Sequence, residues 1–252
     1  MSDLAVKVAA VYERIRAAAE RAGRQAEAIT LVAVTKTHPL ETVIEAYQAG
    51  LHHFGENRAA EGQPKAVALA AWLAGSGAVS SVQSDWPTWH MIGHVQSRQV
   101  EQVLGQFALI HAVDSLKLAQ RINRLAERDN YPPVEILLQC NVSGEETKSG
   151  FALDHWSSDK DQLGGFLEAI SQMARLPKIA MRGLMTMAPL ADDPEAARPT
   201  FQSLAALRAA LQVTMPQQEW QHLSMGMTDD FEVAIEEGAT LIRVGRAIFG
   251  ER

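Results

Sequence analysis

The sequence predicts an α/β protein, a single (β/α)8 TIM barrel with an extra N-terminal helix. Three observations predict it. The chain has 252 residues, and barrels of this kind typically have about 250. Short apolar runs alternate with longer amphipathic stretches, as strands alternate with helices. The strand–helix pairs number eight, which is the count that closes a barrel. An open doubly wound sheet is the competing architecture, because periodicity alone cannot show that a sheet closes.

The first elements set the pattern. Residues 4–22 carry apolar side chains at intervals of three or four, which line one face of a helix. Residues 29–36 (ITLVAVTK) are rich in β-branched residues and too short for a helix, so they are expected to form a strand that is buried on both faces. Residues 40–49 follow as a helix that ends at Gly50.

The same pattern recurs seven more times, and residues 1–252 are expected to be one domain. Further strands are expected at residues 52–55, 89–92, 109–113, 134–140, 179–185, 222–224 and 240–244. Helices are expected from about residues 58 and 97, at 115–128, within 162–174, at 195–211 and 229–237, and near 246. The stretches 74–87 and 155–165, which are rich in small and polar residues, are expected to be exposed loops.

Composition excludes several classes of protein. The 23 basic and 30 acidic residues give a net charge of −7, which excludes a strongly basic nucleic-acid-binding protein. A single cysteine, Cys140, excludes an internal disulfide framework and suits a reducing compartment. No segment approaches the roughly 20 apolar residues that span a bilayer, and charged residues interrupt residues 1–20. We therefore expect a cytoplasmic protein that contacts neither membrane nor nucleic acid.

A barrel enzyme carries its reacting groups at the carboxyl ends of the strands. Lys36 ends the first apolar run, and burial in a barrel mouth would lower the pKa of its amine from about 10.4. A neutral amine can attack an aldehyde, so Lys36 is a candidate for a Schiff base with a substrate carbonyl or with pyridoxal phosphate. The alternative is an ordinary lysine that points into solvent.

The ends of the last two strands favour a phosphate site. Ser224, Gly226 and Gly245 follow strands seven and eight, where barrels often bind phosphate through backbone amides and a short helix N-terminus. Together with Lys36, such a site describes pyridoxal phosphate well. The glycines could also serve turn geometry alone.

Other candidates are weaker. His90 and His94 are four residues apart but are expected at the end of a strand, so they would not share a helical face as metal ligands do, and no metal is expected. Cys140 is expected to be a small core residue. The acidic residues Asp229, Asp230 and Glu232 are expected in the first turn of a helix, where they are structural.

Six segments of the chain carry a resemblance to a known family. They are LVAVTKTHP (31–39), HHFGENRAAE (52–61), WHMIGHVQSRQ (89–99), CNVSGEETKSGF (140–151), MRGLMTMAP (181–189) and LSMGMTDDFEVAIEEGATLIRVGRAIFGER (223–252). In this order the segments resemble the pyridoxal phosphate homeostasis protein family.

The resemblance implies a barrel like the N-terminal domain of alanine racemase, with pyridoxal phosphate held as an internal aldimine. By their positions in the motifs, the cofactor-binding residues would be Lys36 for the aldimine, Asn57 at its side, Ser224, Gly226, Gly245 and Arg246 for the phosphate, and Arg243 beside the pyridine nitrogen. Many relatives have a small hydroxyl residue in place of Arg246, so only its backbone amide is carried over. His94 replaces a proline of some relatives.

The family is regarded as a carrier or regulator of pyridoxal phosphate without an established catalytic activity. The resemblance therefore implies a carrier, with apoenzymes that depend on this cofactor as candidate partners. A cation at Arg243 would weaken the cofactor ring as an electron sink.

An amino-acid racemase is the alternative, and it needs a second base on the opposite face of the cofactor. The three tyrosines, Tyr12, Tyr47 and Tyr131, are all expected away from the mouth. A Schiff-base aldolase without a cofactor is a third possibility, for which Glu56 is the only evident carboxylate. The absence of a second domain suggests a monomer.

Overall fold

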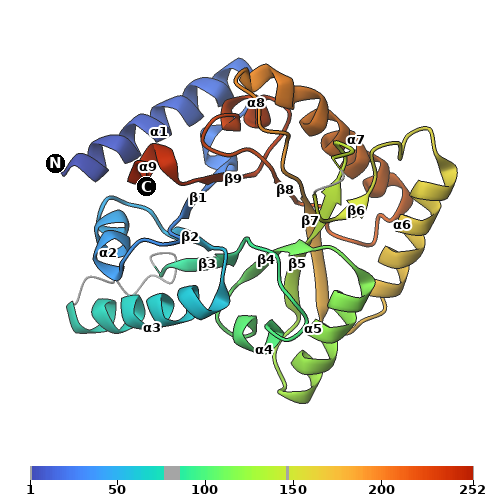
Figure 1. The fold of residues 1–252 in the computed structure, drawn as a ribbon, viewed down its shortest axis with the longest axis horizontal. Helices are drawn as coiled ribbons and strands as arrows, with labels where there is room; N and C mark the ends of the chain where they lie inside the picture. Colours follow the sequence, from blue (N-terminus) through green and yellow to red (C-terminus); the bar gives the residue numbers. More distant parts are fainter. Residues whose placement is uncertain (1, 77–85, 146–147, 252) are drawn as a thin grey trace.

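The computed structural model describes residues 2–76, 86–145 and 148–251, and these residues form a closed barrel of eight parallel strands (Figure 1). The strands of the barrel are β1 (Thr30–Val34), β2 (His53–Glu56), β3 (Thr88–Met91), β4 (Leu109–Val113), β5 (Val134–Asn141), β7 (Ile179–Met185), β8 (His222–Ser224) and β9 (Leu241–Val244). They neighbour one another in the order β4-β3-β2-β1-β9-β8-β7-β5, and pairing of β4 with β5 closes the barrel. The predicted TIM barrel is confirmed, and the open sheet is excluded.

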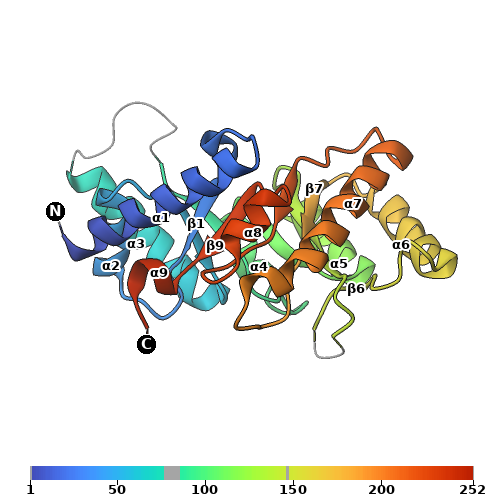
Figure 2. The ribbon, with the colours of Figure 1, turned by 90° about the horizontal axis from the view of Figure 1, so that it is seen from above.

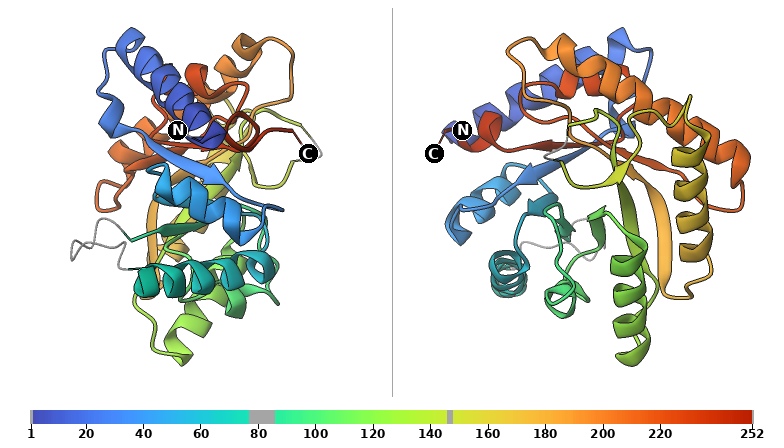
Figure 3. Two further views of the ribbon diagram at one scale, coloured as in Figure 1. Left: turned by 90° about the vertical axis from the view of Figure 1, so that its left-hand side faces the viewer. Right: turned by 45° about the vertical axis from the view of Figure 1, so that its right-hand side comes forward.

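Helices surround the barrel and cover its outer face (Figure 2). They are α1 (Asp3–Arg21), α2 (Leu40–Gln48), α3 (Ala59–Ser76), α4 (Val100–Val103), α5 (Leu116–Arg128), α6 (Lys160–Met173), α7 (Arg198–Thr214), α8 (Phe231–Glu236) and α9 (Arg246–Phe249), with two 3₁₀ turns at Ala26–Ala28 and Pro194–Ala197. Helix α1 is the predicted extra N-terminal helix. It packs against α8 and α9 from the end of the chain (Figure 3).

Two predicted loops have different bounds in the structure, and one short strand was not predicted. The loop predicted at 155–165 ends early, because the Asp159 carboxylate accepts hydrogen bonds from the backbone of residues 161 and 162 and starts α6 at Lys160. Both of the glycines in this segment are therefore helical. The loop predicted at 74–87 begins inside α3, and its residues 77–85 lie outside the described residues. The short strand β6 (Phe151–Ala152), which pairs with β5, was not predicted.

The apolar core has two layers. The larger layer lies between the strands and the helices and includes Cys140, which is 1% exposed, as predicted. The smaller layer fills the inside of the barrel and consists of Val32, Leu109, Ala112, Leu137, Met185 and Leu241. Side chains alternate along a strand, so Arg243, two positions after Leu241, also points inward. A register shift between Ile110 and Val113 interrupts this alternation in β4, where His111 is buried against His90 and Ser224.

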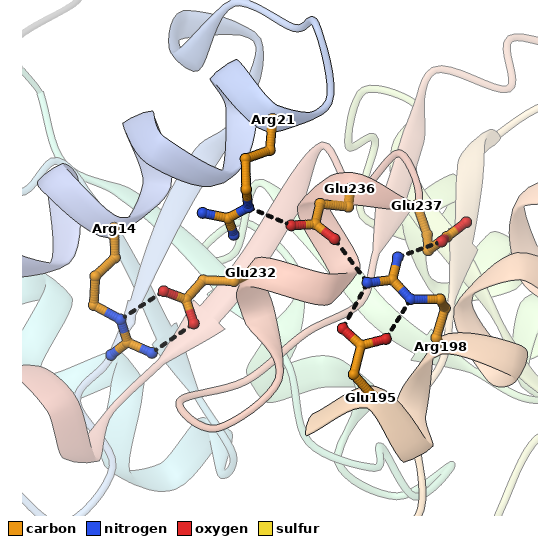
Figure 4. Close-up of polar contacts among 7 residues, drawn as sticks. All are labelled: Arg14, Arg21, Glu195, Arg198, Glu232, Glu236 and Glu237. Carbon is orange, nitrogen blue, oxygen red and sulfur yellow. Dashed lines mark hydrogen bonds and ion pairs between the residues drawn. The ribbon is translucent and has the colours of Figure 1, made fainter. Parts of the chain in front are cut away.

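A network of ion pairs on the outside joins α1 to α8 and α7 (Figure 4). We call it the outer ion-pair network; its members are Arg14, Arg21, Glu195, Arg198, Glu232, Glu236 and Glu237. Arg198 lies at its centre and contacts three carboxylates, each with an N–O distance of 2.6 or 2.7 Å. The network holds the N-terminal helix against the helix that follows β8. Within the described residues, no helix combines the length and the apolar character that crossing a bilayer requires.

Candidate functional site

A cavity of about 1080 Å³ opens at the carboxyl ends of the strands. Five of the seven residues predicted to bind a cofactor line it: Lys36, Asn57, Arg243, Gly245 and Arg246. They come from segments that are far apart in the sequence, and the parallel order of β2, β1 and β9 places them side by side. The cavity therefore lies where the barrel architecture puts reacting groups.

Lys36 follows β1 in a segment that is fixed on both sides. The backbone carbonyl of Thr35 accepts a hydrogen bond from Lys65 Nζ at 2.8 Å, and the Thr35 hydroxyl donates to Glu56 Oε1 at 2.7 Å. On the other side, the backbone N–H of Thr37 donates to the Glu61 carboxylate. We call Thr35, Glu56, Glu61 and Lys65 the loop-anchoring cluster, because it holds the backbone before and after Lys36.

Glu56 is the buried member of this cluster. Its side chain is fully buried, and its Oε2 has no hydrogen-bond partner among the described residues. Burial raises the pKa of the Glu56 carboxyl, while hydrogen bonds from Lys65 and Thr35 oppose that shift. Lys65 Nζ lies 2.9 Å from Glu56 Oε1 and 2.7 Å from Glu61 Oε1. Sequence reasoning did not single out Lys65, although its spacing of four from Glu61 is that of a helical ion pair.

Arg243 points from β9 into the barrel and reaches the floor of the cavity. Its side chain donates hydrogen bonds to Ser224 Oγ at 2.5 Å and to the Thr186 carbonyl at 3.0 Å. Burial lowers the pKa of Arg243 to about 10, and the nearby Asp230 carboxylate opposes that shift. At neutral pH the guanidinium is therefore still a cation.

Ser224 and Gly226 do not line the cavity. Ser224 is fully buried, and its hydroxyl contacts Arg243 and His111 inside the barrel. Gly226 has a φ of +93°, and a Cβ there would lie 2.6 Å from the Cβ of Ala234, so glycine lets this loop pack tightly on α8. Met227 and Thr228, the next residues along the chain, do line the cavity. The phosphate-binding role of Ser224 and Gly226 stays a prediction.

The rim carries charged side chains of both signs. Arg246 forms an ion pair with Asp229, and both line the cavity. Asp229 therefore lies before α8, outside the predicted first turn. Asp230 precedes the first residue of this helix and accepts a hydrogen bond from the backbone N–H of Met227 at 2.6 Å.

The two histidines weighed as metal ligands lie apart. His94 is on the rim, 3.2 Å from Asp114, whereas His90 is 3% exposed inside the barrel. No group of three or more histidine, cysteine, aspartate or glutamate residues that could hold a metal occurs in the described part of the chain.

Sequence reasoning missed a row of three histidines inside the barrel. His53 Nδ1 lies 3.0 Å from His90 Nε2, and His90 Nδ1 lies 3.0 Å from His111 Nε2. His111 Nδ1 lies 2.8 Å from Ser224 Oγ. We call His53, His90 and His111 the histidine column. Alternation from the inward-facing Leu109 favours an inward His111, but a register shift in β4 brings Ala112 into the same interior layer, so alternation alone does not place this histidine.

The tyrosines lie away from the cavity. Tyr12 is on α1, Tyr47 is buried in α2, and Tyr131 lies before β5 against Gly105. None of the three is among the described residues that line the cavity.

Comparison with known proteins identifies the family. The model of the family described as alanine racemase, N-terminal domain, matches residues 6–252. A pyridoxal phosphate homeostasis protein of Aquifex aeolicus is 38% identical over 98% of this chain and 97% of its own. Another from Escherichia coli K12 is 37% identical over 100% of this chain and 98% of its own. The chain belongs to the pyridoxal phosphate homeostasis protein family.

Solved structures agree with this membership. PipY of Synechococcus elongatus PCC7942, solved with pyridoxal 5′-phosphate (PLP) bound, is 32% identical, with a TM-score of 0.72 over 95% of this chain and 100% of PipY. A Bifidobacterium adolescentis protein is 34% identical, with a TM-score of 0.85 over 99% of this chain and 97% of that protein. Alanine racemase of Clostridium difficile shares the fold at 12% identity, and this member of the pyridoxal phosphate homeostasis protein family covers only 57% of it.

Proposed function

We propose that this protein binds PLP in the cavity at the barrel mouth and acts in intracellular PLP homeostasis as a carrier or buffer. The observation that carries the proposal is that Lys36, Asn57, Arg243, Gly245 and Arg246 line one cavity. PLP has an aldehyde, a pyridine nitrogen and a phosphate. Lys36 supplies an amine for the aldehyde, and Arg243 supplies a cation for the pyridine nitrogen. The segment of Gly245 and Arg246 supplies backbone N–H groups for the phosphate.

Lys36 holds the cofactor covalently in this proposal. In its unprotonated form Nζ would attack the aldehyde carbon, a C=N bond would form, and the aldehyde oxygen would leave as water, which gives a Schiff base. The reaction is reversible by hydrolysis, as a carrier requires. The loop-anchoring cluster fixes the backbone on both sides of Lys36 and so limits the positions that its side chain can reach.

The phosphate is held by the segments that follow β8 and β9. Gly245 leaves space for close approach, and Arg246 contributes its backbone N–H, because its side chain is already paired with Asp229. We assign Ser224 and Gly226 an indirect part: Ser224 fixes Arg243, and Gly226 shapes the loop that continues into Met227 and Thr228.

Arg243 is the group that favours a carrier over an enzyme. As a permanent cation beside the pyridine nitrogen, it disfavours protonation of the ring, which PLP enzymes use to draw electrons from a carbanion. The cofactor is then held without efficient carbanion chemistry. In further detail we propose a cytoplasmic, single-domain monomer that passes PLP to PLP-dependent apoenzymes.

Borohydride trapping tests the proposal. Protein incubated with PLP is reduced, digested and mapped by mass spectrometry, and the phosphopyridoxyl adduct is expected on the peptide that contains Lys36. The Lys36→Arg variant should lose the adduct, and the exposed Lys117→Arg variant on α5 should keep it. A wild-type protein without an adduct, or with equal labelling of all lysines, would refute the proposal.

A further inference from the structure

The histidine column crosses the inside of the barrel and ends at the arginine of the site. His53, His90 and His111 lie on the neighbouring strands β2, β3 and β4 (Figure 1). Ser224 lies on β8, which is three places from β2 in the strand order. The contacts His53–His90, His90–His111 and His111–Ser224 measure 3.0, 3.0 and 2.8 Å, and Arg243 donates to Ser224 at 2.5 Å.

Because the row is buried, every contact in it must be a hydrogen bond. His111 and Ser224 are fully buried, His90 is 3% exposed, and only His53 is partly exposed. A buried polar atom without a partner is costly, so each contact must contain one hydrogen atom. A neutral imidazole has one N–H and one lone pair. Three neutral histidines in a row therefore satisfy every contact only if all of them donate in the same direction.

Arg243 fixes that direction. A guanidinium can only donate, so Ser224 Oγ accepts from it, and the Ser224 hydroxyl is free to donate to His111 Nδ1. His111 Nε2–H then donates to His90 Nδ1, and His90 Nε2–H donates to His53 Nδ1. The opposite direction would turn the positive N–H ends of all three rings toward the cation. It would also leave the Ser224 hydrogen without an acceptor among the contacts described for this oxygen.

We propose that His53, His90 and His111 are positioning residues that act on the PLP site through Ser224 and Arg243. In this row each histidine is neutral and carries its proton on Nε2. The column keeps the Ser224 hydroxyl turned so that its oxygen accepts from Arg243, and this contact holds the guanidinium at the cavity floor. The part of the proposal that concerns PLP rests on the proposed function, whereas the proton positions do not.

The surrounding charges agree with neutral rings. Arg243 at one end and the partly exposed His222 of β8 both disfavour a positive charge on His111. Burial lowers the pKa of His90 to about 3 and also lowers the pKa of His111 and of His53. Asp230 near Arg243 is the carboxylate that acts on the far end of the row.

Nitrogen NMR of the histidine rings tests the proton positions without any cofactor. Wild-type protein labelled with ¹⁵N-histidine is recorded at pH 7, and single-histidine variants assign the signals. The expected result is the neutral tautomer protonated on Nε2 for all three residues. A His90 or His111 protonated on Nδ1, or on both nitrogens, would overturn the proposal.

Variants of His111 test the effect on the site. His111→Phe removes both contacts and should weaken PLP binding by about tenfold. His111→Asn keeps an acceptor for Ser224 and should stay within about threefold of the wild type. Leu109→Ala is the control, since it opens a cavity in the same interior layer and should lower stability without changing PLP affinity.

The outcomes separate the two proposals. Wild-type affinity in a folded His111→Phe variant would overturn the positioning role. Failure of the wild type to form a Lys36 adduct would overturn the proposed function instead, and the NMR result would then still decide how the column is protonated. If His111→Phe does not fold, the PLP affinity of His90→Phe and the ring tautomers of the wild type test the positioning role instead.

Discussion

Two polar regions of this protein differ in where they lie and in what they hold. The inner region consists of the loop-anchoring cluster and the histidine column with Ser224 and Arg243, and Glu56, His111 and Ser224 in it are fully buried. The outer ion-pair network lies on the surface, and its central Arg198 side chain is 27% exposed (Figure 4). The inner groups contact the backbone around Lys36 and the side chain of Arg243. The outer groups contact only helices.

The difference follows from solvation. Water screens the exposed ion pairs, so each contributes at most about 1 kcal/mol to stability. The inner groups have exchanged water for fixed partners, so removal of one partner leaves another group buried and unsatisfied. We therefore expect substitutions of inner residues to change both stability and the site, and substitutions of outer residues to change stability slightly.

The largest effect is expected for Lys65→Met. Without Lys65, the buried Glu56 loses its cation and the Thr35 carbonyl loses its donor, which should lower the free energy of unfolding by about 3 kcal/mol. Chemical denaturation measures this loss. Lys65→Arg, which keeps the charge, should recover most of it. A loss below about 1 kcal/mol in Lys65→Met would show that the cluster behaves like a surface ion pair.

On acidification, the inner and outer regions should lose stability in different pH ranges. The pKa of His90 is lowered by burial to about 3 from an ordinary 6.5, so its neutral form stabilises the fold above pH 6.5, and this contribution is lost as the pH falls toward 3. The slope reaches about 1.4 kcal/mol per pH unit for each such histidine. Hydrogen bonding to Arg198 and Arg21 lowers the pKa of Glu236 from 4.5, so the network loses stability only below that pH.

Denaturation curves between pH 7 and 5 measure the histidine contribution by itself. His90→Gln should flatten the slope in this window, and Glu236→Gln should leave it unchanged. An unchanged slope in His90→Gln would contradict the assignment of a neutral buried ring.

A smaller effect is expected for Arg198→Ala. It removes three ion pairs from the outer network and should lower the free energy of unfolding by about 1 kcal/mol. The loss should shrink in 1 M salt, where the screening length falls to about 3 Å. Lys36 labelling by PLP should not change. A loss of stability that does not depend on salt would show that Arg198 behaves like the buried groups of the inner region.

The smallest effect is expected for Arg16→Ala. Arg16 pairs with Glu13 on the exposed face of α1, and both side chains are more than half exposed. The free energy of unfolding should change by no more than the error of the measurement, because water screens this pair. A larger change in thermal or chemical denaturation would mean that the exposure of a side chain does not predict how much stability its substitution costs.

The bounds of a strand could be predicted from the sequence wherever an apolar run gives way sharply to polar or turn-forming residues. The strands Leu109–Val113, Ile179–Met185 and His222–Ser224 were predicted at their observed bounds, because polar or turn-forming residues follow each apolar run. The rule that strand ends carry the site also predicted Lys36 and Gly245, which line one cavity, whereas Asn57 and Arg243 were expected from the family resemblance. These features depend on local sequence.

The missed features depend on register and on packing between distant elements. Ser224 pairs with Leu241, and this register places its hydroxyl beneath the cavity. To predict the histidine column, one would have to know the register of β2, β3 and β4 relative to one another. Lys65 reaches Glu56 because Gly62 lets α3 approach β2 closely, where a Cβ would lie 2.9 Å from the Glu56 Cβ. None of these distances can be read from spacing along the chain.

Crystals of the protein grown with PLP would test the central claim most directly. We predict continuous electron density from Lys36 Nζ to the cofactor, with the pyridine nitrogen beside Arg243 and the phosphate between the segments that follow β8 and β9. A cofactor attached to a different lysine, or an empty cavity at saturating PLP, would contradict it.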